Sequence, residues 1–216
     1  MNRARSIPHD CALPPLAVSL DESHMSREFG ALLSTIEGAR GSRYRVRACE
    51  IMRVKYRPGR NAVIGYRLKI SDTQTGASMD QLLCGGLYTN GEAHSRFEKA
   101  LGAVKAGDDV FPPVSLIEKL GMVVWAFPND RKLDSLPVLT DLRRLRSQFL
   151  PQIVGLHWGP DWRISTMSHR IVSYFPEHSC TVRMDLGLEH IRRDSAQSWS
   201  VYGKTRYDHA GGDTLK

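Results

Sequence analysis

The sequence lacks the features that mark several classes of protein. Its four cysteines include no C-x-x-C pair, which excludes a zinc ribbon and a dense disulfide framework. No apolar run approaches the roughly 18 residues of a membrane-spanning helix. Arg3 and Arg5 near the start precede no apolar stretch, so we expect no signal peptide, no membrane partner and a cytoplasmic location.

Metal-ligand spacings are also missing. None of the eight histidines belongs to an H-x-x-x-H pair, so we expect no metal site. His178 and Cys180 lie two positions apart, and on a strand they would share a face. A nucleophilic pair needs an orienting third group, and none is apparent, so we expect Cys180 to be a small core residue.

The composition that remains is that of a globular protein. The chain has 216 residues, of which 41% are hydrophobic and 25% are charged, enough for one large or two small domains. Thirty Lys and Arg against 23 Asp and Glu give a formal net charge of +7. This charge favours acidic partners such as nucleotides, phosphates or nucleic acid.

Hydrophobic periodicity predicts an α+β fold. Apolar residues at helical spacing between Met25 and Ile36 predict a first helix. Three strands, a helix and two strands then follow, and the short connections between strands predict an antiparallel five-stranded sheet with a packed helix over residues 1–130. The expected segments are strands at 53–57, 64–70 and 81–88, a helix after Asn90, and a hairpin over 115–127.

The second part of the chain has a different pattern. A helix is predicted from about Leu136 to Leu150 and is expected to end at Pro151, within a helical linker over 131–162. Alternating residues predict strands over 163–208. The residues expected to point inward from the helix are Leu139, Leu142, Leu145 and Phe149.

The strands repeat when the chain is shifted by 118 positions. Residues 54–58, VKYRP, fall on 172–176, VSYFP, and Gly85 falls on Gly203 without a gap. The inward and outward positions stay in phase, which a slip of one residue would reverse. Residues 163–216 are therefore predicted to be a partial second β-β-β copy, truncated at Lys216 before its helix. The alternative is that two hairpins with similar proline turns look alike.

Residues 54–60, VKYRPGR, and 201–204, VYGK, resemble the N-terminal lobe of the aminoglycoside phosphotransferase (choline kinase-like) family, which has a protein-kinase-like fold. The resemblance covers most of 44–130 and again 163–210. It implies the N-terminal fragment of a small-molecule kinase-like protein. In such kinases a lysine on the third strand holds the phosphates of ATP, and Lys204 matches it. An ordinary exposed strand lysine is the alternative.

The chain also departs from this family. The first copy has Gly86 at the lysine position, and Glu98 on the following helix is expected to face solvent without a lysine partner. No His-x-Asp sequence occurs, so the catalytic loop and the magnesium-binding carboxylates are missing. We therefore assign no catalytic or metal residue and expect no kinase turnover from this chain alone. ATP and Mg²⁺ are expected only with the missing C-terminal lobe.

Two other functions remain open. The first is a non-catalytic interaction module that docks on a protein partner or on the missing lobe. The second, which is less favoured, is a nucleic-acid-binding sheet in which Tyr56 and Tyr66 stack on bases. Strand alternation places both tyrosines on the apolar face, away from most cations. The basic residues concerned are Arg53, Lys55, Arg57, Arg60, Arg67 and Lys69.

Overall fold

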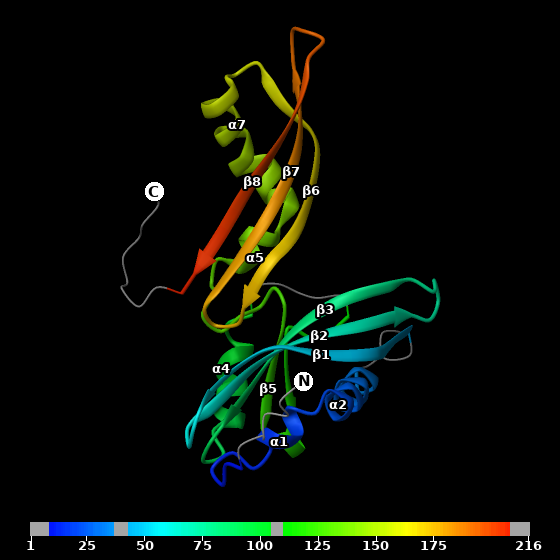
Figure 1. The fold of residues 1–216 in the computed structure, drawn as a ribbon, viewed down its shortest axis with the longest axis vertical. Coiled ribbons are helices and arrows are strands. Elements are labelled where there is room, and N and C mark those ends of the chain that lie inside the picture. The colour runs from blue at the N-terminus through cyan, green and yellow to red at the C-terminus, as the bar shows by residue number, and fades with distance from the viewer. Residues whose placement is uncertain (1–8, 37–42, 105–109, 208–216) are drawn as a thin grey trace, which may run out of the picture. The chain divides into compact units, whose positions relative to one another are not determined.

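The computed structural model describes residues 9–36, 43–104 and 110–207. The chain divides into two compact units, Met1–Arg131 (unit 1) and Lys132–Lys216 (unit 2). Each unit combines helices with an antiparallel sheet, so the predicted α+β class is confirmed (Figure 1). In the part of the chain that is described, no helix is both long enough and apolar enough to cross a membrane.

Unit 1 contains the predicted antiparallel five-stranded sheet, with strand order β1-β2-β3-β5-β4. Two helices precede a three-stranded meander, and one helix separates the meander from the last two strands. The elements are α1 (Leu16–Ser19), α2 (Glu22–Ser34), β1 (Tyr44–Arg57), β2 (Asn61–Asp72), β3 (Ser78–Tyr88), α4 (Ala93–Leu101), β4 (Val114–Ile117), the 3₁₀ turn η1 (Glu118–Leu120) and β5 (Met122–Ala126).

Helix α2 packs its apolar side against one face of this sheet. Asp21 caps the helix, because its Oδ1 accepts a hydrogen bond from the backbone N–H of His24 at 2.8 Å. Tyr66 of β2 is fully buried beneath Phe29, with ring centroids 5.0 Å apart in an edge-to-face arrangement. The hydroxyl of Tyr66 donates to the carbonyl oxygen of Ser19 at 2.8 Å, which ties the sheet to the end of α1.

The opposite face of the sheet is closed near β3 and β5. Ala93 and the partly buried Phe97 of α4 pack there against Trp125 of β5. Gly86 lies under the same cluster. A Cβ at this position would lie 2.6 Å from the Tyr88 Oη atom and 3.1 Å from Cζ3 of Trp125, so the site has no room for a side chain.

Unit 2 contains a three-stranded antiparallel sheet in the order β6-β7-β8. Its helices lie along one face of that sheet (Figure 1). The elements are α5 (Leu136–Thr140), α6 (Leu142–Arg144), the π-helical turn η2 (Leu145–Phe149), α7 (Leu150–Trp158), β6 (Trp162–Phe175), β7 (Ser179–His190) and β8 (Ala196–Arg206).

The strands of unit 2 reproduce those of unit 1 at a shift of 118 residues. β1 and β6 both have 14 residues, β2 and β7 both have 12, and β3 and β8 both have 11. The pairing registers agree at both ends of the strands, where Tyr44 lies opposite Asp72 and Trp162 lies opposite His190. The second register shift falls between Ile51 and Arg53 in β1 but between Ile171 and Ser173 in β6, so equivalent residues occupy equivalent places except beside this bulge.

The helices before each sheet also correspond, at a shift of 120 residues, which the sequence analysis did not find. The Asp21 cap on the N–H of His24 recurs as Asp141 Oδ1, which accepts from the N–H of Arg144 at 3.0 Å. The segment expected to be a linker therefore carries the same helical start as unit 1. The identical pairs are Asp10 and Asp130, Leu13 and Leu133, Leu16 and Leu136, Val18 and Val138, Asp21 and Asp141, and Phe29 and Phe149.

The extent predicted for the helix from Leu136 to Leu150 is wrong. The helical path is broken into short segments and continues through α7 to Trp158. Pro151, which was expected to end the helix, lies in the first turn of α7. Proline is tolerated there because a first-turn N–H has no partner within its own helix.

The π-helical turn changes which residues face the core. A π turn inserts one extra residue, so the buried side advances by one position. Leu150 and Val154 are buried, whereas Phe149, expected to point inward, is 41% exposed. Its sequence counterpart in unit 1, Phe29, is fully buried.

Asp72 organises the loop between β2 and β3. Its Oδ2 accepts from Nη2 and Nε of Arg43 at 2.6 and 3.0 Å, and its Oδ1 accepts from the N–H groups of Gln74 and Thr75 at 2.9 and 3.3 Å. The hydrogen bonds from Arg43, and then those from the loop, hold the pKa of the buried Asp72 carboxyl well below its usual range.

This depressed pKa predicts an acid-sensitive contribution to stability. The stabilisation by Asp72 is fully present above the unfolded-state pKa of about 3.9 and is lost as the pH falls toward the lower folded-state pKa. The Asp72→Asn variant is therefore expected to melt several degrees below the unsubstituted chain at pH 7, with the gap shrinking below about pH 4. Thermal unfolding followed from pH 7 to pH 2 measures this.

Asp80→Asn is the matched control, because Asp80 is a half-exposed carboxylate on the same hairpin, and among the described residues its side chain pairs with Lys69 alone, at 3.1 Å. It should change the melting temperature little at any pH. A gap for Asp72→Asn that stayed constant across the acid range would contradict the assigned role.

Candidate functional site

The side of the β6–β7–β8 sheet away from the helices is its polar side, and we call it the open face. Alternate residues of β7 point to the two sides, so Val182 and Met184 are buried beneath the helices and their neighbours are not. The open-face residues of the central part are Ser168 and Arg170 of β6, Thr181, Arg183 and Asp185 of β7, and Ser200, Tyr202, Lys204 and Arg206 of β8.

Lys204, the one site residue predicted from the sequence, lies on this face and is exposed. It is opposite Thr181 in the pairing of β7 with β8. The adjacent Gly203 points to the helix side, where a Cβ would lie 3.2 Å from Cε of Met184 and even closer to Leu139. The glycine is therefore needed for close packing of α5, and it leaves Lys204 directed to the open face.

Three further cations share the open face with Lys204. Arg206 is two positions along β8, and Arg183 is diagonal to Lys204 on β7, which places their Cβ atoms about 7 Å from that of Lys204. Arg170 of β6 lies directly opposite Arg183. We call Arg170, Arg183, Lys204 and Arg206 the cationic cluster.

The positive charge of the cationic cluster exceeds the negative charge of the neighbouring Asp185. In the described part of the chain, Arg170, Lys204 and Arg206 make no side-chain hydrogen bond or salt bridge. Like charges directly opposite each other on neighbouring strands, as in Arg170 and Arg183, destabilise a sheet. An anion bound over this face would relieve that repulsion.

Asp185 partly compensates the cluster. It accepts hydrogen bonds from the hydroxyl of Ser200 and from Nε of Arg183, the latter at 2.8 Å. These two bonds, with Arg170 acting through space, lower the pKa of Asp185. The same contact raises the pKa of Arg183. Asp185 therefore stays ionised and fixes Arg183 in place.

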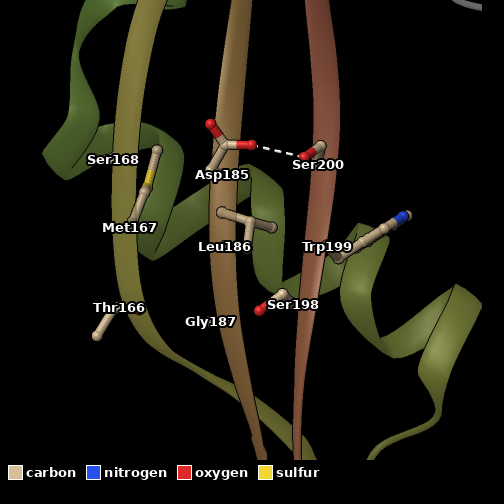
Figure 2. Close-up of a pocket in the computed structure, with 9 residues that line it drawn as sticks. All are labelled: Thr166, Met167, Ser168, Asp185, Leu186, Gly187, Ser198, Trp199 and Ser200. Atoms are coloured by element: carbon tan, nitrogen blue, oxygen red, sulfur yellow. Dashed lines mark hydrogen bonds between the residues drawn. The ribbon is translucent and has the colours of Figure 1, made fainter.

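An open pocket of about 300 Å³ adjoins the Asp185–Ser200 pair. Figure 2 shows the side chains of Asp185 and Ser200 reaching toward each other from β7 and β8. The pocket does not include Lys204, whose Cα lies four residues, or about 13 Å, further along β8 from Ser200. Its lining residues are Thr166, Met167, Ser168, Asp185, Leu186, Gly187, Ser198, Trp199 and Ser200.

The equivalent positions in unit 1 carry no charge. At the shift of 118, Arg183, Lys204 and Arg206 correspond to glycine, glycine and tyrosine. Those residues, Gly65, Gly86 and Tyr88, belong to strands whose corresponding face is closed by α4. Glu98, expected to face solvent, is exposed on α4. The two units therefore share one strand arrangement, but the equivalent face is uncharged and covered by a helix in unit 1 and cationic and uncovered by the helices of unit 2.

The basic residues of β1 and β2 form a different arrangement. Arg67 pairs with Glu50 at 3.4 Å and Lys69 pairs with Asp80 at 3.1 Å. Tyr66 is fully buried, as strand alternation predicted, and has no face available for a base. These contacts give little support to a nucleic-acid-binding sheet in unit 1.

The donor atoms of the open face suit an anion better than a metal ion. Within residues 9–36, 43–104 and 110–207, no group of three or more His, Cys, Asp or Glu side chains is placed to hold a metal. Asp185 is already engaged by Arg183 and Ser200. Cys180 is fully buried, as expected for a core residue.

Sequence reasoning found Lys204 but not the other three cations. Arg206 lies two positions from Lys204 on the same strand, so alternation alone places it on this face, whereas the strand register brings Arg170 and Arg183 there. A signal was present, because the shift of 118 sets each of Arg183, Lys204 and Arg206 against an uncharged residue. Comparison of the chain with protein-family models, with curated proteins and with solved structures gives no match.

Proposed function

We propose that unit 2 binds the phosphate groups of a nucleotide such as ATP on its open face, with Lys204 as the central contact. In this proposal the chain is the N-terminal part of a phosphotransferase-like, kinase-fold protein. Unit 1 is a copy of the same lobe that has lost its phosphate contact. Binding without turnover is the activity proposed for this chain alone.

The observation that carries the proposal is the contrast between the two units. Equivalent strand positions hold Gly86 under a helix in one unit and an exposed Lys204 in the other. A lysine selected only for solubility would not require Arg183 and Arg206 beside it. The clustering of cations on a rigid sheet, with repulsion left between Arg170 and Arg183, favours an anionic ligand.

The chemistry of the cluster fits a polyphosphate. An arginine held by a carboxylate keeps a fixed orientation and offers N–H groups to phosphate oxygens, while a lysine supplies a mobile point charge. Arg183 is held in this way by Asp185, and Lys204 lies diagonal to it. The carboxylates described on this face do not form a magnesium site, so no step is assigned to Mg²⁺.

The test is nucleotide binding measured by calorimetry on the whole chain at low salt, with ATP, tripolyphosphate and adenosine as ligands. ATP and tripolyphosphate should bind and raise the melting temperature, and adenosine should not. Lys204→Ala should weaken ATP binding by about 10-fold or more, the size of one charge-assisted hydrogen bond. Added salt should weaken binding as well.

Arg193→Ala is the matched control. Arg193 lies in the exposed turn between β7 and β8, and its substitution removes one positive charge, as Lys204→Ala does. It should leave ATP affinity within about twofold, as expected for a screened surface charge. No binding at millimolar ATP, or equal losses in the two variants, would contradict the proposal and favour a module that binds protein alone.

A further inference from the structure

The outer edge of β8 is the least protected strand edge of unit 2. β8 is the last strand in the order β6-β7-β8. Its equivalent in unit 1, β3, is not an edge, because Leu83–Leu87 pair with Met122–Ala126 of β5. The residues of β8 equivalent to that paired stretch are Val201–Thr205.

The backbone groups that face outward from β8 follow from two hydrogen bonds. The N–H of Tyr207 donates to His178 O at 2.8 Å. Counting back along β8 from Tyr207, every second residue therefore directs its backbone N–H and C=O groups toward β7. Ser200, Tyr202 and Lys204 therefore turn their N–H and C=O groups outward. In unit 1 the equivalent Leu82 O accepts from Phe127 N at 3.0 Å, just beyond β5.

Side chains form hydrogen bonds with the outer edges of β1 and β6. Glu22 Oε1 accepts from the N–H of Ile51 on β1 at 2.8 Å. Nη2 of Arg146 donates to the carbonyl oxygens of Ile164 and Ser165 on β6 at 3.2 and 2.8 Å. Across the described chain, no side chain makes a comparable hydrogen bond to the outward groups of β8. Native proteins usually block such an edge.

We propose that the outer edge of β8 docks an antiparallel β-strand of a protein partner, in the register that β5 takes on β3. The pairing fixes the chemistry of that strand. The residue at the place of Val123 falls opposite Lys204, where an acidic side chain is favoured. The residue of the docked strand that corresponds to Trp125 falls opposite Tyr202, where an aromatic side chain is favoured. The docked residue between these two positions is expected to be apolar. This proposal does not rest on nucleotide binding, although both proposals use Lys204.

The probe is a fluorescent peptide with the sequence of residues 121–127 that carries Val123→Glu, titrated with the whole chain and followed by anisotropy. Saturable binding is expected, and a peptide with Val123→Lys should bind several-fold more weakly because it places a like charge opposite Lys204. Amide signals of β8 should shift on binding, with those of β6 unchanged.

Tyr202→Pro is the decisive variant. Proline removes one outward N–H and leaves the N–H groups that face β7, so an edge strand tolerates it. It should weaken peptide binding by about 10-fold or more, whereas Tyr202→Ala should retain binding within about threefold. If Tyr202→Pro fails to fold, methylation of the peptide nitrogen tests the same bond in the unaltered protein.

The methylated peptides form a matched pair. N-methylation at Trp125 blocks an N–H that faces the β8 edge and should abolish binding, and N-methylation at Val124 blocks one that faces away and should not. Equal binding of the two peptides would overturn the proposal. So would self-association of the chain that Tyr202→Pro removes, because the edge would then belong to a second copy.

Discussion

Gly86→Lys is expected to unfold unit 1, at a cost of more than about 3 kcal/mol. A Cβ at this position would lie 2.6 Å from Tyr88 Oη and 3.1 Å from the Trp125 ring. The guanidinium of Arg96 lies over the Tyr88 ring at 4.3 Å, so the new ammonium would also approach a like charge. Hydrogen exchange should show lost protection in β3 and β5.

Unit 2 supplies the comparison for this experiment. Lys204→Gly makes the reverse exchange at the equivalent exposed position and should cost no more than about 1 kcal/mol, the usual effect of glycine in a strand. Peptides from β7 should keep their protection in the Gly86→Lys variant. If Gly86→Lys retained full protection in β3 and β5, the face under α4 would not be closed as described, and the contrast between the units would fail.

Tyr66→Ala should destabilise unit 1 by about 3–5 kcal/mol, the range for deleting a large buried ring. Tyr66 is fully buried and meets Phe29 edge to face. Burial also raises the pKa of its phenol well above the ordinary value. Urea unfolding followed by hydrogen exchange in β2 and α2 measures the loss.

Tyr66→Phe separates packing from the hydrogen bond to Ser19 O. It should cost only about 1 kcal/mol, the typical net value of one hydrogen bond. A Tyr66→Phe variant as unstable as Tyr66→Ala would show that the bond to α1, rather than the ring against α2, holds this part of the core.

The sheet architecture was predictable because strand alternation is strictly local. Alternating residues predicted the strands in their order along the chain, and the repeat at 118 positions predicted equivalent residues whose pairing registers match outside the second bulge of β1 and β6. The repeated helices escaped notice for a physical reason. Asp21 precedes Tyr44 by 23 positions and Asp141 precedes Trp162 by 21, so a single shift cannot superpose both helices and strands.

The candidate site was predictable only in part. Lys204 was identified from its match to a kinase lysine, with an ordinary exposed strand lysine as the alternative; it is exposed on β8 and does not line the pocket. The position of Arg170 opposite Arg183 depends on how β6 and β7 pair, which a β-bulge near Ile171 changes locally. The periodicity of either strand alone does not determine this non-local pairing.

The π-helical turn at Leu145–Phe149 has a consequence for how the two units should be aligned. Up to Leu145 the helices match position for position at one shift, and Leu145 takes the place of Met25. Beyond the turn, Leu150 occupies the buried place of Phe29, so the sequence match of Phe149 with Phe29 pairs a surface residue with a core residue. A sequence alignment that pairs Phe149 with Phe29 is therefore displaced by one residue from an alignment based on the folded helices.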